Sequence, residues 1–156
     1  MAKVKSETKK KPVTKKETKK KEIKDELPTE VTDKVWLWAH RDNDKPIPET
    51  ELKSKDVGNN LIGKWLIYLS KGYIDEFWIK IKKATEEGLL GIGAKVKTSK
   101  SVERSYVICV YTKDYNNEED VNRVREELKN LGILRPISYK RDIDTFMGNN
   151  EGFYRE

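Results

Sequence analysis

The chain has 156 residues, of which 38% are charged and 35% hydrophobic, and a formal net charge of +6. This length suits one folded domain with a tail, and no apolar stretch approaches the ~20 residues of a transmembrane helix. A single cysteine excludes an intrachain disulfide, and a single histidine excludes a zinc site built from a Cys/His cluster.

Residues 1–31 contain eleven lysines and six acidic residues, and therefore carry +5 of the net charge. So few apolar side chains cannot offset the entropy lost on ordering. We predict a disordered Lys-rich tail over 1–31, dispensable for folding, and a single α+β domain over 32–156. The tail either keeps the protein soluble or attracts polyanions. With no apolar segment after the lysines and no disulfide, the sequence indicates a cytoplasmic protein.

In the first half of the chain, the pattern predicts strands at 35–40 and 64–69, with Gly72 ending the second. Apolar residues at helical spacing then predict a helix from about Asp75 to Glu87, followed by Gly88 as a stop. A third strand is expected at 92–98.

The second half begins with an uninterrupted apolar run, which predicts a core strand at 106–111. Asn117 followed by three acidic residues is typical of a helix N-terminus, and Gly132 of the end of that helix. A fifth strand is expected at 137–140, and residues 141–156 are expected to be irregular.

These elements predict an α+β fold: a curved mixed or antiparallel sheet of at least five strands with two helices on one face. Both helices have one apolar stripe, so the other face of the sheet is left open. An open face of this kind is a place to expect a binding site.

Trp36, Trp38 and His40 share one face of the first strand, because side chains alternate along a strand. Tryptophans on an exposed face can stack on a base, but packing in the core or over an edge is the commoner role, which we favour here. Trp78 and Cys109 are predicted to be buried structural residues.

Lysines occur inside strands at positions 64, 95 and 97, opposite the apolar residues. They form either an ordinary solvated face or a positive patch suited to phosphate. Gly91 and Gly93 lack the Lys-Ser/Thr of a phosphate-binding loop and indicate a bulge or a close approach of the backbone. No hydrolase nucleophile motif is present.

Several short sequence motifs, in their order along the chain, resemble those of one known family. They are Gly63-Lys-Trp-Leu, Gly91-Ile-Gly-Ala-Lys-Val-Lys-Thr98, Val107-Ile-Cys-Val-Tyr-Thr112, Asp120-Val, Arg123-Val and Tyr139-Lys-Arg-Asp-Ile-Asp-Thr145. Over residues 34–154 the chain is similar to the basophilic-leukaemia-expressed protein family. The resemblance implies the fold of the cap-binding translation initiation factor 4E, a curved antiparallel sheet backed by helices.

That factor holds a methylated guanine between two tryptophans and reads it with a glutamate, but no tryptophan pair here matches that role. Some prokaryotic relatives resemble phosphothreonine lyases, which use a lysine base, a histidine and phosphate-holding cations. The chain has these residue types, yet Trp38 interrupts the Lys-x-His word of those enzymes.

The sequence therefore predicts binding of a phosphate-bearing ligand, RNA or nucleotide, on the open face, with a phosphothreonine lyase acting by β-elimination as the alternative. The partner would be RNA, a nucleotide or a phosphoprotein; we expect no membrane contact, cofactor or metal. The catalytic candidates are His40, Lys64 and Lys95, and the ligand-binding candidates are Trp38, Arg104, Tyr139, Lys140 and Arg141.

Overall fold

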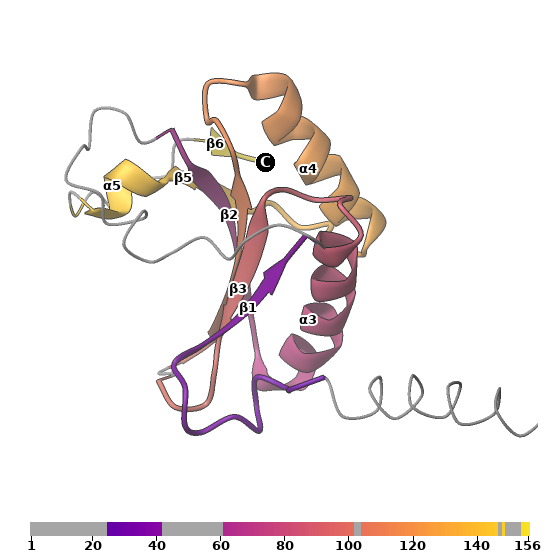
Figure 1. The fold of residues 1–156 in the computed structure, drawn as a ribbon, viewed down its shortest axis with the longest axis vertical. Coiled ribbons are helices and arrows are strands. Elements are labelled where there is room, and N and C mark those ends of the chain that lie inside the picture. Colours follow the sequence, from indigo (N-terminus) through magenta and orange to yellow (C-terminus); the bar gives the residue numbers. More distant parts are fainter. Residues whose placement is uncertain (1–24, 42–60, 102–103, 147, 149–153) are drawn as a thin grey trace, which may run out of the picture.

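A computed structural model of the chain describes residues 25–41, 61–101, 104–146, 148 and 154–156. Its strands form one antiparallel sheet of spatial order β1-β3-β4-β2-β5-β6 (Figure 1). Their bounds are β1 Trp36–His40, β2 Gly63–Leu69, β3 Gly93–Lys97, β4 Tyr106–Thr112, β5 Ser138–Arg141 and β6 Tyr154–Arg155.

Helices α3 (Lys71–Glu86) and α4 (Glu118–Asn130) both cover the same face of the sheet (Figure 1). The main core lies between them and the sheet, where Trp65, Trp78 and Ile108 are among its fully or almost fully buried side chains. The α+β class, the antiparallel sheet and the placement of both helices on one face are as the sequence predicted. Trp78 is 1% exposed and Cys109 4%, which confirms that both are buried.

The two helices begin differently. In α4, the Asn117 side chain accepts a hydrogen bond from the Asp120 amide at 3.2 Å, as expected of an N-cap. In α3, Ser70 is the N-cap and the helix starts at Lys71, so Gly72 lies inside it. The prediction that Gly72 ends β2 was wrong, because the exposed residues Lys71 to Tyr73 precede the buried apolar stripe from which the start of α3 was inferred.

The C-terminal segment also differs from the prediction, since α5 (Asp142–Phe146) and β6 occupy part of the region expected to be irregular. A buried arginine fixes this end of the chain. The Arg125 guanidinium, on α4, donates to the main-chain oxygens of Ile133, Arg135 and Glu156, each at 2.9 Å. Contacts between positions so far apart in sequence cannot be read from local pattern.

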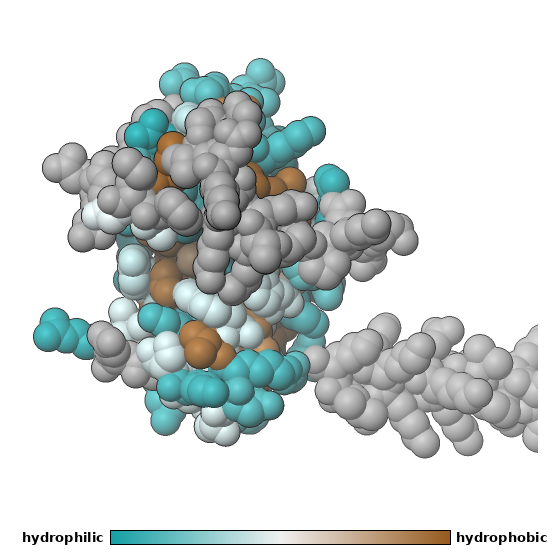
Figure 2. Space-filling view, turned by 60° about the vertical axis from the view of Figure 1, so that its left-hand side comes forward, coloured by the Kyte–Doolittle hydropathy of each residue, from teal (hydrophilic) through white to brown (hydrophobic). Residues whose placement is uncertain are grey.

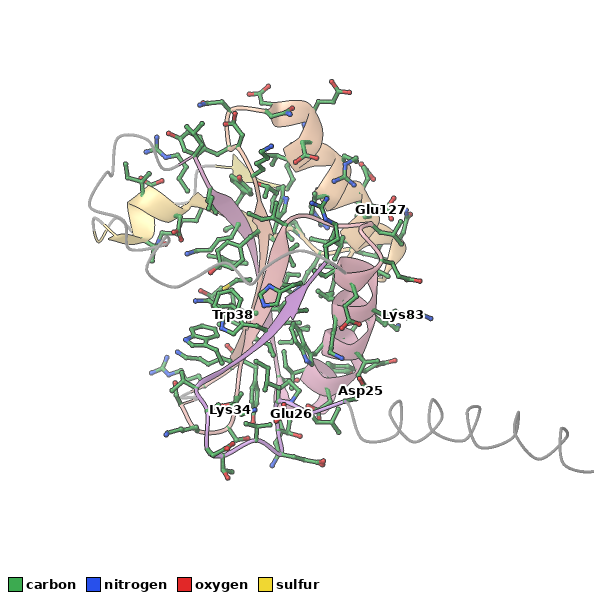
Figure 3. All side chains as sticks on the ribbon, in the orientation of Figure 1. Asp25, Glu26, Lys34, Trp38, Lys83 and Glu127 are labelled. Carbon is green, nitrogen blue, oxygen red and sulfur yellow. The ribbon has the colours of Figure 1, made fainter. Side chains whose placement is uncertain are left out.

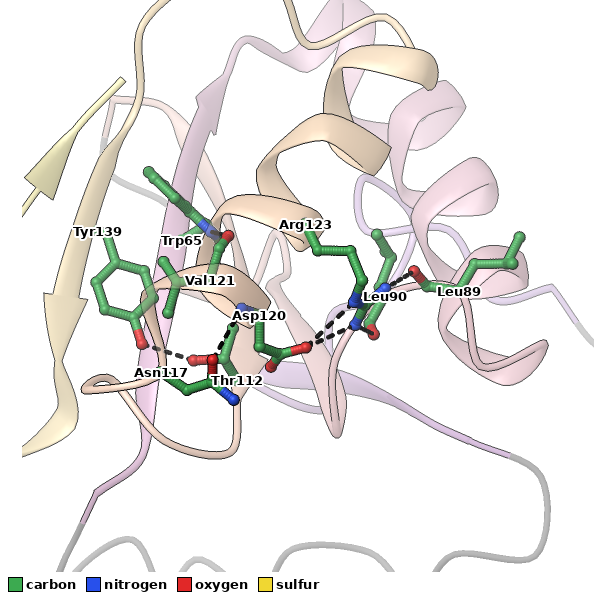
Figure 4. Close-up of polar contacts among 9 residues, drawn as sticks. All are labelled: Trp65, Leu89, Leu90, Thr112, Asn117, Asp120, Val121, Arg123 and Tyr139. Atoms are coloured by element: carbon green, nitrogen blue, oxygen red, sulfur yellow. Dashed lines mark hydrogen bonds and ion pairs between the residues drawn. The ribbon is translucent and has the colours of Figure 1, made fainter.

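Two glycines of the family words permit close approaches. A Cβ on Gly91 would stand 1.8 Å from the Tyr111 carbonyl oxygen, and one on Gly63 would stand 1.9 Å from the Tyr139 hydroxyl. This confirms the close approach predicted for Gly91. Figure 4 shows neighbouring contacts that join the layers: Trp65 Nε1 donates to the Val121 carbonyl at 3.1 Å, across the sheet–α4 interface.

Residues 25–31 pack against the folded domain, so the described fold begins earlier than the predicted boundary at residue 32. Val31 is buried in the main core, and the Thr29 amide donates to the Asp75 carboxylate on α3 at 3.1 Å. The Ser99 amide donates to the Pro28 carbonyl at 2.9 Å. The rest of the predicted tail, residues 1–24, lies outside the described residues.

Two truncations should therefore behave differently. We expect deletion of residues 1–24 to leave the unfolding midpoint nearly unchanged, because their composition cannot build a core. Deletion of residues 1–31 removes a buried valine and the tertiary hydrogen bonds that Pro28 and Thr29 make with Ser99 and Asp75, and should cost about 3 kcal/mol. Urea unfolding of both variants provides the measurement, and equal midpoints would contradict this account.

Candidate functional site

The face of the sheet away from α3 and α4, called the open face below, carries side chains in cross-strand rows. The strand register places His40, Gly93, Tyr111, Lys64 and Lys140 in one row. Trp38, Lys95, Cys109, Leu66 and Ser138 form the next row, and Trp36 stands opposite Lys97 beyond it. The predicted sharing of one face by Trp36, Trp38 and His40 is thus confirmed.

Aromatic rings stack at the β1 end of this face. The Trp38 ring lies nearly parallel to the His40 ring, with centroids 5.9 Å apart, and nearly parallel to the Tyr111 ring at 6.0 Å. Tyr111 is fully buried, whereas Trp36 and Trp38 are half-buried and remain partly accessible. In Figure 3, Trp38 points away from the side covered by the helices.

These rings belong to a second hydrophobic cluster, separate from the main core. Val107, Cys109 and Tyr111 are its buried members, and Trp36 and Trp38 pack against them. All seven residues of β4 are buried as a result, although helices cover only one side of the sheet. The expectation that packing is the tryptophans' role thus holds in part, but they pack on the open face and not beneath the helices. Figure 2, turned toward this side, shows pale and apolar surfaces adjoining one another below the residues drawn in grey.

Lysines stand among these rings. The Lys95 Nζ lies 3.9 Å from the centroid of the Trp36 ring and 5.2 Å from that of Trp38. The Lys97 Nζ lies 5.7 Å from the Trp36 ring, so two ammonium groups face one indole. Both distances lie within the range of cation–π attraction.

Lys64 forms a buried ion pair at the other side of Tyr111. Its Nζ lies 2.8 Å from Asp142 Oδ1, and both side chains are 7% exposed. The same Nζ lies 5.7 Å from the Tyr111 ring centroid. Asp142 is the first residue of α5, and its amide donates to the Ile62 carbonyl at 2.8 Å. The pair therefore fastens α5 to the first row of the open face.

Three of the predicted ligand-binding residues lie elsewhere. Tyr139 points to the helix side, where it is fully buried, packs against Trp65 and shares a 2.6 Å hydrogen bond with the Thr112 hydroxyl (Figure 4). Arg141 also faces that side, since it stands opposite Gly63. Arg104 is exposed in the loop between β3 and β4, beyond the end of the sheet that holds Lys97. Tyr139 and Arg141 therefore do not share a face with Lys64, and Arg104 lies on no strand.

Arg141 instead contacts α5, which follows it in the chain, and Tyr115 in the loop before α4. It makes two hydrogen bonds to Asp144, at 2.7 and 2.8 Å, and lies 5.3 Å from the Tyr115 ring centroid. These bonds hold the pKa of Asp144 below its usual value. A consecutive Tyr-Lys-Arg word cannot place all three side chains on one face, because alternate residues of a strand point in opposite directions.

The lyase candidates are spread across the sheet. His40 and Lys64 occupy the same row, but β3 and β4 lie between their strands, which separates the two backbones by ~14 Å at the usual strand spacing. Lys95, on β3, is the nearer lysine to His40. Lys64 is moreover engaged in an ion pair, since its Nζ lies 2.8 Å from Asp142 Oδ1.

The sequence patterns did not single out Tyr111 and Asp142, and they named Trp36 and Lys97 without including them among the final site candidates. The alternation in β1 and β3 was a signal for Trp36 and Lys97, since each lies two positions from a candidate. The apolar run of β4 gave no such signal for Tyr111. The role of Asp142 could not be predicted from local pattern, because its partner Lys64 lies 78 positions away in the sequence.

Cys109 has no features of a nucleophile. Burial raises the pKa of its thiol above the ordinary value, although Lys64 and Lys95 act in the opposite direction. Among the residues that the structure describes, no group of three or more His, Cys, Asp or Glu could hold a metal ion. The helices within the described ranges are all too short or too polar to cross a membrane.

Solved structures with a similar fold are translation initiation factors. A schistosome eIF4E complexed with m7GpppA and 4E-BP has a TM-score of 0.64 at 18% identity, over 84% of this chain and 75% of that one. C. elegans eIF4E-3, in complex with the 4E-binding protein Mextli and a cap analog, has a TM-score of 0.58 at 20% identity, over 78% of this chain and 68% of that one. Ascaris suum eIF4E-3 with m2,2,7G cap has a TM-score of 0.51 at 22% identity, over 68% of this chain and 61% of that one. At these identities the likeness shows the shared fold, as the sequence words implied.

A family model matches residues 1–148, which include both the Lys-rich tail and nearly the whole sheet. The structure explains several of the short motifs that resemble this family. Gly63 and Gly91 permit close approaches of the chain, and Arg123 donates hydrogen bonds to Asp120 and to the Leu89 and Leu90 carbonyls. The chain belongs to the family of basophilic leukemia-expressed protein Bles03.

Proposed function

We propose that the open face binds a phosphate-bearing ligand, RNA or a nucleotide, by stacking a base on its tryptophans and attracting phosphate to its lysines. The observation that carries this proposal is the arrangement of Trp36, Trp38, Lys95 and Lys97 on two adjacent strands. Base–aromatic stacking and lysine–phosphate attraction are the two contributions on which single-stranded nucleic-acid binding depends.

The charge of the face supports the proposal. Its described strand residues include Lys64, Lys95, Lys97 and Lys140, and Asp142 pairs with Lys64. Two of the solved structures with this fold were crystallised with cap nucleotides, which are phosphate-bearing ligands. A role for the basic tail in holding a polyanion would add attraction without base recognition.

Binding should depend on the open face and not on the helix side. We expect Trp38→Leu, which keeps a packing group but removes the indole, to weaken binding of a short mixed-sequence RNA about 10-fold, in line with the usual value of a base–aromatic stack. Lys140→Met should weaken it several-fold and reduce its salt dependence. Lys83→Met is the matched control, because Lys83 is exposed on the outer side of α3 (Figure 3).

Fluorescence anisotropy of labelled RNA, measured at two salt concentrations, provides the affinities. If the Lys-rich tail alone bound the RNA, Trp38→Leu would not change the affinity. If both open-face variants bind as tightly as the parent protein, the proposed site is wrong.

The lyase alternative is tested with the same proteins. In β-elimination a base removes the α-proton of phosphothreonine, the Cβ–O bond breaks and phosphate leaves, so the peptide product contains a dehydrated residue. Mass spectrometry of a phosphothreonine peptide would detect that product. Its formation by the parent protein and its loss in Lys95→Met would favour the enzyme over the binding protein.

A further inference from the structure

We propose that the cleft between the end of β2 and the segment leading into β5 binds a short extended peptide that carries an acidic side chain. The cleft has a volume of about 500 Å³, and its walls include Tyr68, Arg135 and Pro136. None of the tryptophans or lysines of the open face lines it among the described residues. The inference therefore goes beyond the proposed function and does not depend on it.

The cleft exists because β5 begins late. β2 continues to Leu69, but it pairs with β5 only as far as Leu66, which stands opposite Ser138. The next pair of this kind in the same register would place Pro136 opposite Tyr68. Proline has no N–H to donate to a ladder, so the pairing ends and the two segments separate.

The main chain of Tyr68 points into this gap. In an antiparallel sheet, alternate residues direct both their N–H and C=O groups toward the same neighbouring strand. The Ile62 carbonyl accepts from the Asp142 amide, so alternate residues from Ile62 to Tyr68 point toward the β5 side. On that side, the Ile137 main chain bonds instead to Glu156, at 2.7 and 2.9 Å.

No described residue therefore pairs with the Tyr68 amide or carbonyl on the β5 side. One donor and one acceptor remain at the wall of the cleft, in the arrangement that a strand presents to its neighbour. An extended peptide supplies the complementary acceptor and donor from its own main chain, as in strand addition to a sheet edge.

The charge of the cleft indicates which peptide it fits. Among its described lining residues, Arg135 is charged and no carboxylate is present. The Arg135 carbonyl accepts from Arg125, which holds the backbone, whereas the exposed guanidinium makes no ion pair with a described residue. A guanidinium binds a carboxylate through two parallel hydrogen bonds, so an aspartate or glutamate of the peptide is its natural partner.

Apolar side chains adjoin the same place. The Tyr68 side chain is 53% exposed, and Leu134, which precedes Arg135, is 73% exposed. Large apolar side chains gathered beside unpaired main-chain groups are typical of an interaction surface. We therefore expect the acidic residue of the peptide to be flanked by apolar residues.

An array of random hexapeptides, probed with the fluorescently labelled full-length protein, tests the inference. The parent protein should retain peptides that combine an acidic residue with apolar neighbours. Arg135→Gln should bind the strongest of them at least about 10-fold more weakly. Lys83→Gln removes an exposed positive charge from α3 and should have no effect. An equal loss in both variants would attribute binding to overall charge, including that of the Lys-rich tail, and would overturn the inference.

Two changes to the strongest peptide separate its contacts, with fluorescence anisotropy as the measurement. Replacing its acidic residue by the corresponding amide should weaken binding to the parent protein about 10-fold but leave binding to Arg135→Gln unchanged, because the two groups act as a pair. N-methylation of each peptide amide in turn should abolish binding at one position, the donor to the Tyr68 carbonyl. Tolerance of the methyl group at every position would rule out strand pairing.

The other outcomes are equally decisive. If no peptide of the array is retained, the inference is wrong. If RNA displaces the peptide and Arg135→Gln weakens RNA binding to the same extent, the cleft belongs to a nucleic-acid site and the inference is wrong as well. Failure of the open-face variants to change RNA binding would overturn the proposed function and leave this inference standing.

Discussion

Replacement of Lys64 by methionine is expected to lower the free energy of unfolding by about 3–5 kcal/mol, since it leaves Asp142 buried without its partner. Methionine matches the length of the lysine stem, so little of the loss should come from packing. Urea unfolding, with the slope held common to both proteins, measures the difference.

A second substitution distinguishes loss of charge balance from loss of contact. In Lys64→Met/Asp142→Asn no buried carboxylate is left without its partner at this position, and most of the stability should return. The exposed pair of Lys34 and Glu26, with side chains 49% and 51% exposed, is the control. Lys34→Met should leave the urea unfolding midpoint nearly unchanged, because exposed ion pairs contribute little to stability. A double variant as unstable as Lys64→Met would show that the ion pair is not the cause.

Truncation of Trp78 to alanine is the other change expected to have a large effect, about 3–5 kcal/mol. Trp78 is 1% exposed and lies on the face of α3 that packs on the sheet, so its loss leaves a cavity in the main core. Tyr73, also on α3, is 59% exposed, and Tyr73→Ala should change stability by no more than about 0.5 kcal/mol. Thermal and urea unfolding provide both values.

Trp78 and Trp38 should also differ in function. Trp78→Ala should lower stability and leave RNA affinity unchanged at temperatures where the protein is folded, because the side chain lies on the helix side of the sheet. Trp38→Leu should do the reverse. If Trp78→Ala weakened RNA binding as much as Trp38→Leu, the division between the core and the open face would not describe the function.

Not every positive residue named by the sequence belongs to the site. Lys64, Lys95 and Lys140 lie on the open face, as does His40 through its stacking on Trp38. Arg141 is engaged with Asp144 on the other side, and Arg104 lies beyond the sheet end. The rows of the sheet explain the division, because a side chain joins the site only if its strand position points toward the open face.

Much of the architecture follows from local sequence. Three features depend only on residues close to one another in the sequence: the apolar run of β4, the Asn117 cap and the apolar stripe of α3. Such local patterns can be recognised without knowing how the rest of the chain folds. The alternation of β1 likewise determined that Trp36, Trp38 and His40 share a face. The start of α3 was harder to predict, since its first three residues, Lys71 to Tyr73, are all exposed.

Strand pairing, by contrast, was decided by the tertiary structure. The order β1-β3-β4-β2-β5-β6 places Lys95 beside Trp38 and Tyr111 beside Lys64, although each pair lies more than 40 positions apart in the sequence. The Lys64–Asp142 pair likewise joins positions 78 apart. The sequence by itself determined which residues alternate along each strand. Only the folded sheet determined which of them meet, because pairing depends on burying one continuous core, a property of all the strands and helices together.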